Sequence, residues 1–349
     1  MFKRILVPLD GSKRAERALP VAARIARQTN GSLLLVRVVS IATELWPYVD
    51  LETAHAQAVV EMELREAAHY LDSRATMPEL EGISVDTVVL HGPTAATILS
   101  VALSRGADLI TICSRSYTGM TRWVMGSIAD KLARYSSVPV LVLRDSGLQP
   151  LTRNASDSQP LRVLAALDGS SRAMASLLPA AALISALATP GRGILHLARV
   201  VKPVLGELED EEQYPFNLCN SEQEVVEATS YLSKTVEHLR AGHLSKMVDL
   251  TWSAVIDTDI ARGIVRMAEC LDNLKDGERC DEFDIIAIST HGYGGTQNWV
   301  TGSTSQRVLN ATRLPILIVR PPDMIKKQDA MMEHISVTTI AEMHTIHSR

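Results

Sequence analysis

The sequence predicts an α/β protein made of two tandem doubly wound domains, each with a five-stranded parallel sheet. Two observations concern self-similarity. The segment ILVPLDGSKRAERALPVAARIA from Ile5 matches VLAALDGSSRAMASLLPAAALIS from Val163, and GSIADKLARYSSVPVLVLR from Gly126 matches GSTSQRVLNATRLPILIVR from Gly302. The third observation is that apolar strand-length runs alternate with helical patterns of a dozen or more residues, which is typical of a parallel sheet covered on both faces.

The repeat indicates a duplicated domain, because a unit this long is not a solenoid repeat. Its opening segments are 158 residues apart and its closing segments 176, so the second copy carries insertions. A chain of 349 residues accommodates two domains of ordinary size. We expect a first domain over residues 1–146, a second over 161–322 and a loosely ordered tail over 323–349. Between the domains, GLQPLTRNASDSQP (147–160) is polar, contains prolines and predicts a linker.

In the first half, buried apolar runs predict strands and amphipathic stretches predict helices. In chain order the strands are Arg4–Leu9, Ser32–Val39, Ser84–Leu90, Asp108–Cys113 and Val138–Leu143. The helices between them are Lys13–Gln28, Leu51–Arg74, Thr94–Ser104 and Ser127–Tyr135.

The second half repeats this order. Its predicted strands are Arg162–Leu167, Gly193–Val200, Val248–Val255, Phe283–Ser289 and Leu314–Val319. Its predicted helices are Ser171–Ala188, Ser221–Ala241, Asp259–Leu274 and Ser303–Ala311. The charged insertions GELEDEEQ (206–213) and DGERCDEFD (276–284) are interpreted as surface loops, the first with partner binding as an alternative.

Composition excludes several functional classes. The net charge of −5 and the low aromatic content of 4% argue against binding of nucleic acid. The longest apolar stretch, around residues 177–188, is too short to span a bilayer, and the N-terminus enters a strand without a signal peptide, so we expect a cytoplasmic protein with no membrane attachment. The cysteines show no CxxC spacing and predict neither a disulfide framework nor a metal site; they are Cys113, Cys219, Cys270 and Cys280.

Ligands of open α/β sheets bind beyond the carboxyl ends of the strands, where the strand order reverses. There each half presents an Asp-Gly-Ser turn, beginning at Asp10 or Asp168, and a Gly-Ser helix start, at Gly126 or Gly302. Ser303 with Gln306, and Ser127 with Asp130, predict capping boxes. A helix start of this kind binds anions through its free amides, although Gly-Ser can also serve only as a cap. Its recurrence beside a recurring aspartate favours the binding interpretation.

These residues resemble the universal stress proteins, whose nucleotide-binding members carry Gly, two residues, Gly, nine residues, Gly and then Ser or Thr. The second half reads Ser289-Thr-His-Gly292, nine residues and Gly302-Ser303, so only the first glycine departs. The first half reads Cys113-Ser-Arg-Ser116, nine residues and Gly126-Ser127, so both leading glycines are replaced. The resemblance extends in tandem over the chain up to about Pro322.

The resemblance implies a role for each matching residue in binding ATP or AMP. In the second half, Asp168 would lie near the adenosine and the Val200 backbone would bond adenine. Phosphates would be held by the glycine-rich segment and the helix start, namely Ser289, Gly292, Gly302, the Ser303 hydroxyl and the Thr304 amide. The matching positions in the first half are Asp10, Val38, Ser116, Gly126 and Ser127.

Departures from the family pattern predict that the two halves differ. A further family glycine is kept as Gly92 but is matched by Thr258. Because a side chain at a glycine position strains the backbone or displaces ligand, we expect the second half to bind nucleotide better than the first. Residues 293–301 contain no Lys or Arg, so phosphate binding there would depend on amides, hydroxyls and a bound Mg²⁺.

No catalytic machinery is evident. His291 lies in the motif without an evident carboxylate partner, and Cys113 is interpreted as a buried apolar residue rather than a redox sensor. No Walker loop, dinucleotide fingerprint or nucleophile elbow is present. An ATP-using enzyme would need a base or a phosphate-clamping lysine, which the sequence does not show, so slow ATP hydrolysis is the most we expect.

The resemblance implies a protein of the stress response that acts through nucleotide-linked interactions. The alternative is a nucleotide-independent scaffold with decayed sites, favoured by the replaced glycines. Domains of the family pair through their last strand, and here Pro139–Arg144 and Pro315–Arg320 supply two apolar edges. Unpaired apolar edges associate, so we expect the halves to pair with each other, and a further homodimer is compatible with this arrangement.

Overall fold

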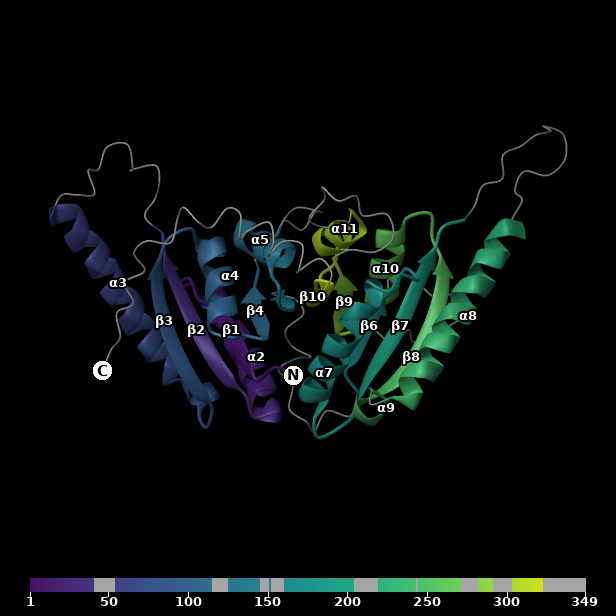
Figure 1. Cartoon of the computed structure of the whole chain (residues 1–349), viewed down its shortest axis with the longest axis horizontal. Helices are drawn as coiled ribbons and strands as arrows, with labels where there is room; N and C mark the ends of the chain where they lie inside the picture. The colour runs from purple at the N-terminus through teal and green to yellow at the C-terminus, as the bar shows by residue number, and fades with distance from the viewer. Residues whose placement is uncertain are drawn as a thin grey trace, which may run out of the picture.

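The computed structural model describes residues 1–40, 54–114, 125–144, 151, 160–203, 219–242, 244–270, 282–290 and 303–322, without the side chains of 54–57, 219–222 and 303. Figure 1 shows the two halves of the chain side by side, with the helices α3 (Ala54–Ala75) and α8 (Cys219–Ala241) at the two outer ends. No described helix combines the length and apolar character that a membrane span requires.

The strands form one ten-stranded sheet in the order β3-β2-β1-β4-β5-β10-β9-β6-β7-β8. In the first half they are β1 (Arg4–Pro8), β2 (Ser32–Val39), β3 (Ser84–His91), β4 (Leu109–Cys113) and β5 (Val140–Leu143). In the second half they are β6 (Arg162–Ala166), β7 (Gly193–Val201), β8 (Val248–Ile256), β9 (Ile285–Ser289) and β10 (Ile316–Val319). Neighbours within each half are parallel, which confirms the predicted doubly wound class.

Helices cover both faces of this sheet. The remaining helices of the first half are α1 (Lys13–Glu16), α2 (Ala18–Thr29), α4 (Thr94–Ser104) and α5 (Ser127–Tyr135), with the 3-10 turn η1 (Pro78–Leu80). In the second half they are α7 (Leu177–Ala188), α9 (Leu244–Met247), α10 (Ile260–Glu269) and α11 (Ser303–Ala311), with η2 (Ala173–Ser176). One buried core lies under α2, α3, α7 and α8, and the other lies under α4, α5, α10 and α11.

Two helices predicted as single elements are each divided in the structure. The predicted helix Lys13–Gln28 separates at Arg17 into α1 and α2, and Ser171–Ala188 separates into η2 and α7. Pro20 and Pro179 lie just after these breaks. Proline has no amide N–H, so the carbonyl four residues earlier lacks its helical partner and the helix cannot run continuously through this turn.

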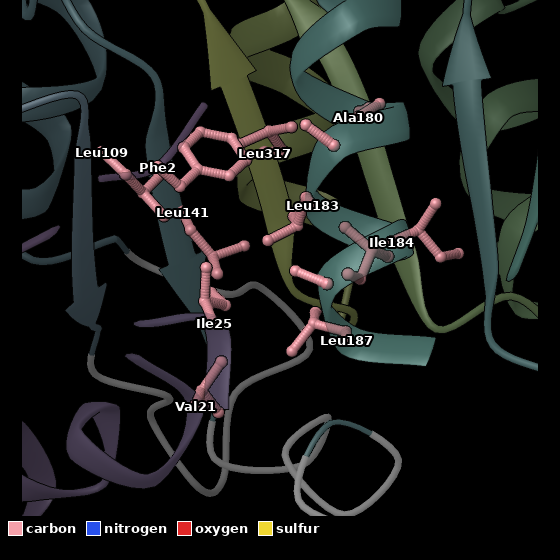
Figure 2. Close-up of a cluster of buried hydrophobic side chains, with 14 of the residues drawn as sticks. Phe2, Val21, Ile25, Leu109, Leu141, Ala180, Leu183, Ile184, Leu187 and Leu317 are labelled. Carbon is pink, nitrogen blue, oxygen red and sulfur yellow. The ribbon is translucent and has the colours of Figure 1, made fainter. Parts of the chain in front are cut away.

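The two halves meet through their last strands, as the sequence predicts. β5 and β10 pair antiparallel, with Leu141 opposite Leu317, and this pairing removes both apolar edges. Below the sheet, α2 and α7 pack against each other. Figure 2 shows the shared core at this junction, where Val21 and Ile25 of α2 face Leu183 and neighbouring side chains of α7.

A buried arginine also links the halves. Arg144, which follows β5, is 0% exposed; its Nη1 donates to Ser114 Oγ (2.7 Å) and its Nη2 to the carbonyl of Leu309 in α11 (2.5 Å). Leu309 lies in the last turn of α11, where carbonyl groups lack helical partners and a cation is favoured. Burial lowers the pKa of Arg144 to about 10, so the guanidinium remains charged at neutral pH.

The predicted linker is anchored rather than wholly solvated. Leu151 is fully buried in the core beneath α2 and α7, and its carbonyl accepts a hydrogen bond from Arg24 Nη1 (3.1 Å). The rest of the predicted linker, apart from Pro160, lies outside the described residues, as do the predicted tail, the first charged insertion and most of the second.

Candidate functional site

The strand order reverses between β1 and β4 in the first half and between β6 and β9 in the second. The Asp-Gly-Ser turns follow β1 and β6, and β4 and β9 end at Cys113 and Ser289. Each half therefore brings its predicted aspartate and the start of its glycine-rich segment to the same edge of the sheet. This is where open α/β sheets bind ligands.

Each Asp-Gly-Ser turn requires its glycine. Gly11 has φ +88° and Gly169 has φ +90°, a conformation that residues with a Cβ rarely adopt. A Cβ at Gly11 would lie 3.5 Å from Arg37 Nη1, and one at Gly169 would lie 3.3 Å from Arg199 Nη1. The guanidinium groups of these two arginines therefore pack against equivalent turns, an arrangement that the sequence analysis did not identify.

The serine of each turn, not the aspartate, caps the following helical segment. Ser12 Oγ accepts from the Ala15 amide (3.2 Å), while Asp10 Oδ1 accepts from the Ser12 amide (2.9 Å) within the turn. In the second half, Asp168 Oδ1 accepts from both the amide (2.9 Å) and the hydroxyl (2.6 Å) of Ser170. Asp10 is exposed and Asp168 is half-buried, so the second turn is the more tightly fixed.

The predicted adenine-binding valines lie on the core beneath α4, α5, α10 and α11. Val200 is buried in this core, and Val38, at the equivalent position of β2, is half-buried and packs against the same core. Gly263 of α10 approaches Val200 closely, because a Cβ added at Gly263 would lie 2.7 Å from Val200 Cγ1. The Val200 side chain is thus packed directly against α10.

The turns after β3 and β8 differ by one residue. The amide of Gly92 donates to Val39 O (3.1 Å), and the amide of Asp257 makes the equivalent bond to Val201 O (3.0 Å). Asp257 rather than Thr258 therefore occupies the place of Gly92, which corrects the sequence alignment.

Each of these turns packs a small residue against a larger one. A Cβ at Gly92 would lie 2.9 Å from Thr97 Oγ1, whereas in the second half Gly263, the counterpart of Thr97, leaves room for the Cβ of Asp257. The first half therefore has its glycine in the turn (Gly92), and the second half has its glycine in the helix (Gly263). Loss of the turn glycine in the second half consequently creates no steric conflict.

A cluster of ion pairs holds the start of α10. Asp257, whose side chain is 2% exposed, accepts from Arg262 Nη2 (2.6 Å) and Arg266 Nη1 (2.9 Å). Asp259 caps α10 by accepting from the Arg262 amide (3.2 Å) and pairs with Arg307 of α11. Hydrogen bonds from these arginines lower the pKa of both aspartates. The sequence signal was the spacing of Asp257, Arg262 and Arg266, which places the arginines one helical turn apart.

The predicted capping box at Ser127 is wrong, whereas the Ser303 hydroxyl of the other predicted box lies outside the described atoms. Gly126 is the N-cap of α5 and makes no side-chain cap, and the Asp130 carboxylate accepts from Arg134 (2.8 Å) and Gln306 (3.0 Å) instead. Asp130 and Gln306 are equivalent positions of the two halves. The Gln306 amide that was expected to return to its own helix start therefore contacts the other half.

The glycine-rich segment is only partly described. Ser289 is buried at the end of β9, and its carbonyl accepts from Ser305 Oγ (2.8 Å), which ties the start of α11 to the strand end. The backbone of Ser303 begins α11, followed by half-buried Thr304, and Ser127 is exposed at the start of α5. The predicted site residues outside the described part are Ser116, Gly292 and Gly302, together with His291.

The cysteines give one confirmation and one correction. Cys113 is buried, as the sequence predicts. Cys270 is disulfide-bonded, contrary to the expectation that no cysteine is paired. The described residues include no group of three or more His, Cys, Asp or Glu side chains that could hold a metal ion.

Comparisons with known proteins identify the family. A sequence model of the universal stress protein family matches residues 1–144, and a universal stress protein of Mycolicibacterium smegmatis is 24% identical over 325 residues, covering 91% of this chain and 97% of that protein. These matches support a tandem member of the universal stress protein family.

Other relatives agree with this assignment. A universal stress protein of Bacillus subtilis is 26% identical over 148 residues, which is 41% of this tandem protein and 100% of that one. The crystal structure of a universal stress protein from Archaeoglobus fulgidus superposes with a TM-score of 0.61 at 16% identity and covers 92% of this chain and 99% of that chain. The structural likeness establishes the fold that the two halves share with that protein.

Proposed function

We propose that this universal stress protein binds ATP or AMP in its second half and acts in the stress response through nucleotide-linked interactions rather than catalysis. The observation that carries this proposal is the convergence, at one sheet edge, of a fixed Asp168 turn, the Val200 strand and the start of α11. Helix starts at such edges bind phosphate groups through free amides. The sequence motif ending at Gly302 and Ser303 is almost complete there.

The ligand fits these groups by chemistry as well as by position. The Val200 backbone offers the donor and acceptor that adenine needs, and the Asp168 carboxylate accepts hydrogen bonds from a ribose hydroxyl. A bound Mg²⁺ would neutralise charge on the phosphates, since residues 293–301 supply no Lys or Arg. Arg307 lies on α11 but pairs with Asp259, so it is already engaged as a positioning group.

The second half is the better candidate for three reasons. Asp168 is half-buried and doubly hydrogen-bonded, whereas Asp10 is exposed. The second-half motif keeps Gly292, while the first half has Ser116 in its place. In addition, Gly263 of α10 leaves room for the side chains of Asp257 and Val200, so the lost turn glycine causes no steric conflict at the site.

Calorimetric titration with Mg-ATP tests the proposal on the intact chain and two matched variants. Gly302→Trp should abolish binding by filling the second helix start, and Gly126→Trp, its counterpart, should leave one site per chain. A chain that binds no nucleotide contradicts the proposal and supports the alternative of a nucleotide-independent scaffold. Binding that survives Gly302→Trp but is lost in Gly126→Trp would place the working site in the first half.

A homodimer would need a surface other than β5 and β10, because these strands already pair with each other. The proposed nucleotide site does not depend on such an assembly, since its described residues come from one half of one chain. Sedimentation with and without Mg-ATP would show whether nucleotide changes the oligomeric state.

A further inference from the structure

Both halves hold an arginine in the same setting, against a tyrosine of the outer helix that covers the sheet. Arg37 lies on β2, with its guanidinium 4.9 Å from the centre of the Tyr70 ring of α3. Arg199 lies on β7, with its guanidinium 5.5 Å from the Tyr231 ring of α8. Each arginine directly precedes a predicted adenine-binding valine, whose side chain points to the other core.

These guanidinium groups are held but not hydrogen-bonded. The tyrosine ring and the positive-φ glycine of the Asp-Gly-Ser turn contact each of them. Within the described part of the chain, neither arginine makes a hydrogen bond or ion pair, although both are half-buried. A guanidinium carries five N–H donors in a planar fork, and an oxyanion satisfies two of them at once.

The surroundings of the two arginines differ in charge, because Glu16 and its ion-pair partners Lys13 and Arg74 are matched in the second half by uncharged residues, namely Met174, Ser171 and Thr235. In the first half, Glu16 accepts from the Tyr70 hydroxyl (3.1 Å) and from Arg74 (3.3 Å), and its side chain is only 10% exposed. In DGSKRAE and DGSSRAM the position of Glu16 is taken by Met174 in the second half. Burial, and secondarily the hydrogen bond to Glu16, raises the pKa of Tyr70, so the hydroxyl stays protonated and donates to this carboxylate.

We propose that the Arg199 guanidinium is an oxyanion-binding site that takes a phosphate group, and that Glu16 closes the equivalent site at Arg37. In the second half the cation, the tyrosine platform and the glycine turn are all present, and among the described residues Met174 stands where the first half has the carboxylate of Glu16. Asp168, which precedes the glycine of this turn, directs Oδ1 to the amide and the hydroxyl of Ser170. The Arg199 guanidinium packs against the Asp168-Gly169-Ser170 turn, which also contributes to the proposed nucleotide site.

The test uses the full chain carrying Gly126→Trp and Gly302→Trp, so that the predicted nucleotide helix starts are blocked and the result does not depend on the proposed function. Calorimetric titration with inorganic phosphate should give one site per chain. Arg199→Gln should weaken that binding at least tenfold, while Arg37→Gln should leave it unchanged. Thermal unfolding of each variant confirms that it is folded.

Two exchanges of the acidic residue make the test reciprocal. Met174→Glu keeps Arg199 but adds the first-half carboxylate, and it should weaken phosphate binding as Arg199→Gln does. Glu16→Met should create a second site that Arg37→Gln removes. Titration with ATP in the same blocked chain identifies the source of the phosphate: binding lost with Arg199→Gln assigns the site to nucleotide phosphates, and binding of inorganic phosphate alone assigns it to a small anion. A chain that binds neither, or that binds equally well after Arg199→Gln, overturns the proposal.

Discussion

Replacing Arg144 tests how the two halves are held together. This guanidinium is fully buried, donates to Ser114 Oγ and to Leu309 O, and joins the end of β5 to the last turn of α11. Arg144→Met keeps most of the side-chain volume and removes both donors, whereas Arg144→Ala removes the volume as well. The pair of variants therefore separates the hydrogen bonds from the packing.

The expected magnitudes follow from these contacts. Loss of hydrogen bonds from a charged donor costs about 1.5–3 kcal/mol each, but relief of the buried charge offsets part of this, so Arg144→Met should destabilise by about 1–3 kcal/mol. Arg144→Ala also leaves a cavity of the size of a large aliphatic side chain, which adds about 2 kcal/mol. The order of stability should be wild type, then Arg144→Met, then Arg144→Ala.

Urea unfolding followed by circular dichroism measures these free energies. Because the cores under both sets of helices contain residues from both halves, we expect one transition for the whole chain. Arg144→Met as stable as the wild type would refute the argument that the two hydrogen bonds outweigh the cost of burial. Two separate transitions would refute the coupling of the halves through the two cores that they share.

Three further predictions concern individual contacts. Burial, and secondarily Arg162, lowers the pKa of His196 to about 4 from 6.5. The contribution of neutral His196 to the free energy of unfolding should therefore be complete above pH 6.5 and fall by about 3 kcal/mol as the pH decreases to 4. Urea midpoints measured against pH should lose this dependence in His196→Gln. Gly169→Ala should destabilise the chain by about 1–2 kcal/mol because of its φ of +90°, and equal thermal midpoints would contradict the strained turn. Gln306→Leu should cost about 1 kcal/mol by removing the bond to Asp130, while exposed Lys131→Ala, the control, should not change the urea midpoint.

Sequence reasoning predicted the sheet well because its signal is local. Apolar strand runs and helical periodicity give the element order, and Ser32–Val39, Thr94–Ser104 and Ser127–Tyr135 have the predicted bounds. The pairing of β5 with β10 followed from two apolar edges that need partners. The breaks at Arg17 and Ser176 were missed, although Pro20 and Pro179 gave the signal.

The contacts between halves could not be predicted, because they depend on which surfaces meet. Gln306 and Asp130 read as capping residues along the chain, yet across the junction they bind each other. The Arg199 and Tyr231 pair likewise joins a strand to a distant helix and has no signature in sequence spacing. The sequence pattern identified Asp10 and Asp168 of the turns, but it did not predict that they accept hydrogen bonds from the serine two residues later.

The most direct test of a nucleotide site in the second half is a crystal structure of the protein with Mg²⁺ and a non-hydrolysable ATP analogue. We predict one nucleotide per chain, with adenine on the Val200 backbone, the ribose beside Asp168 and the phosphates at the start of α11. A nucleotide bound at the Asp10 edge of the first half, or an empty second half at saturating analogue, would contradict the account.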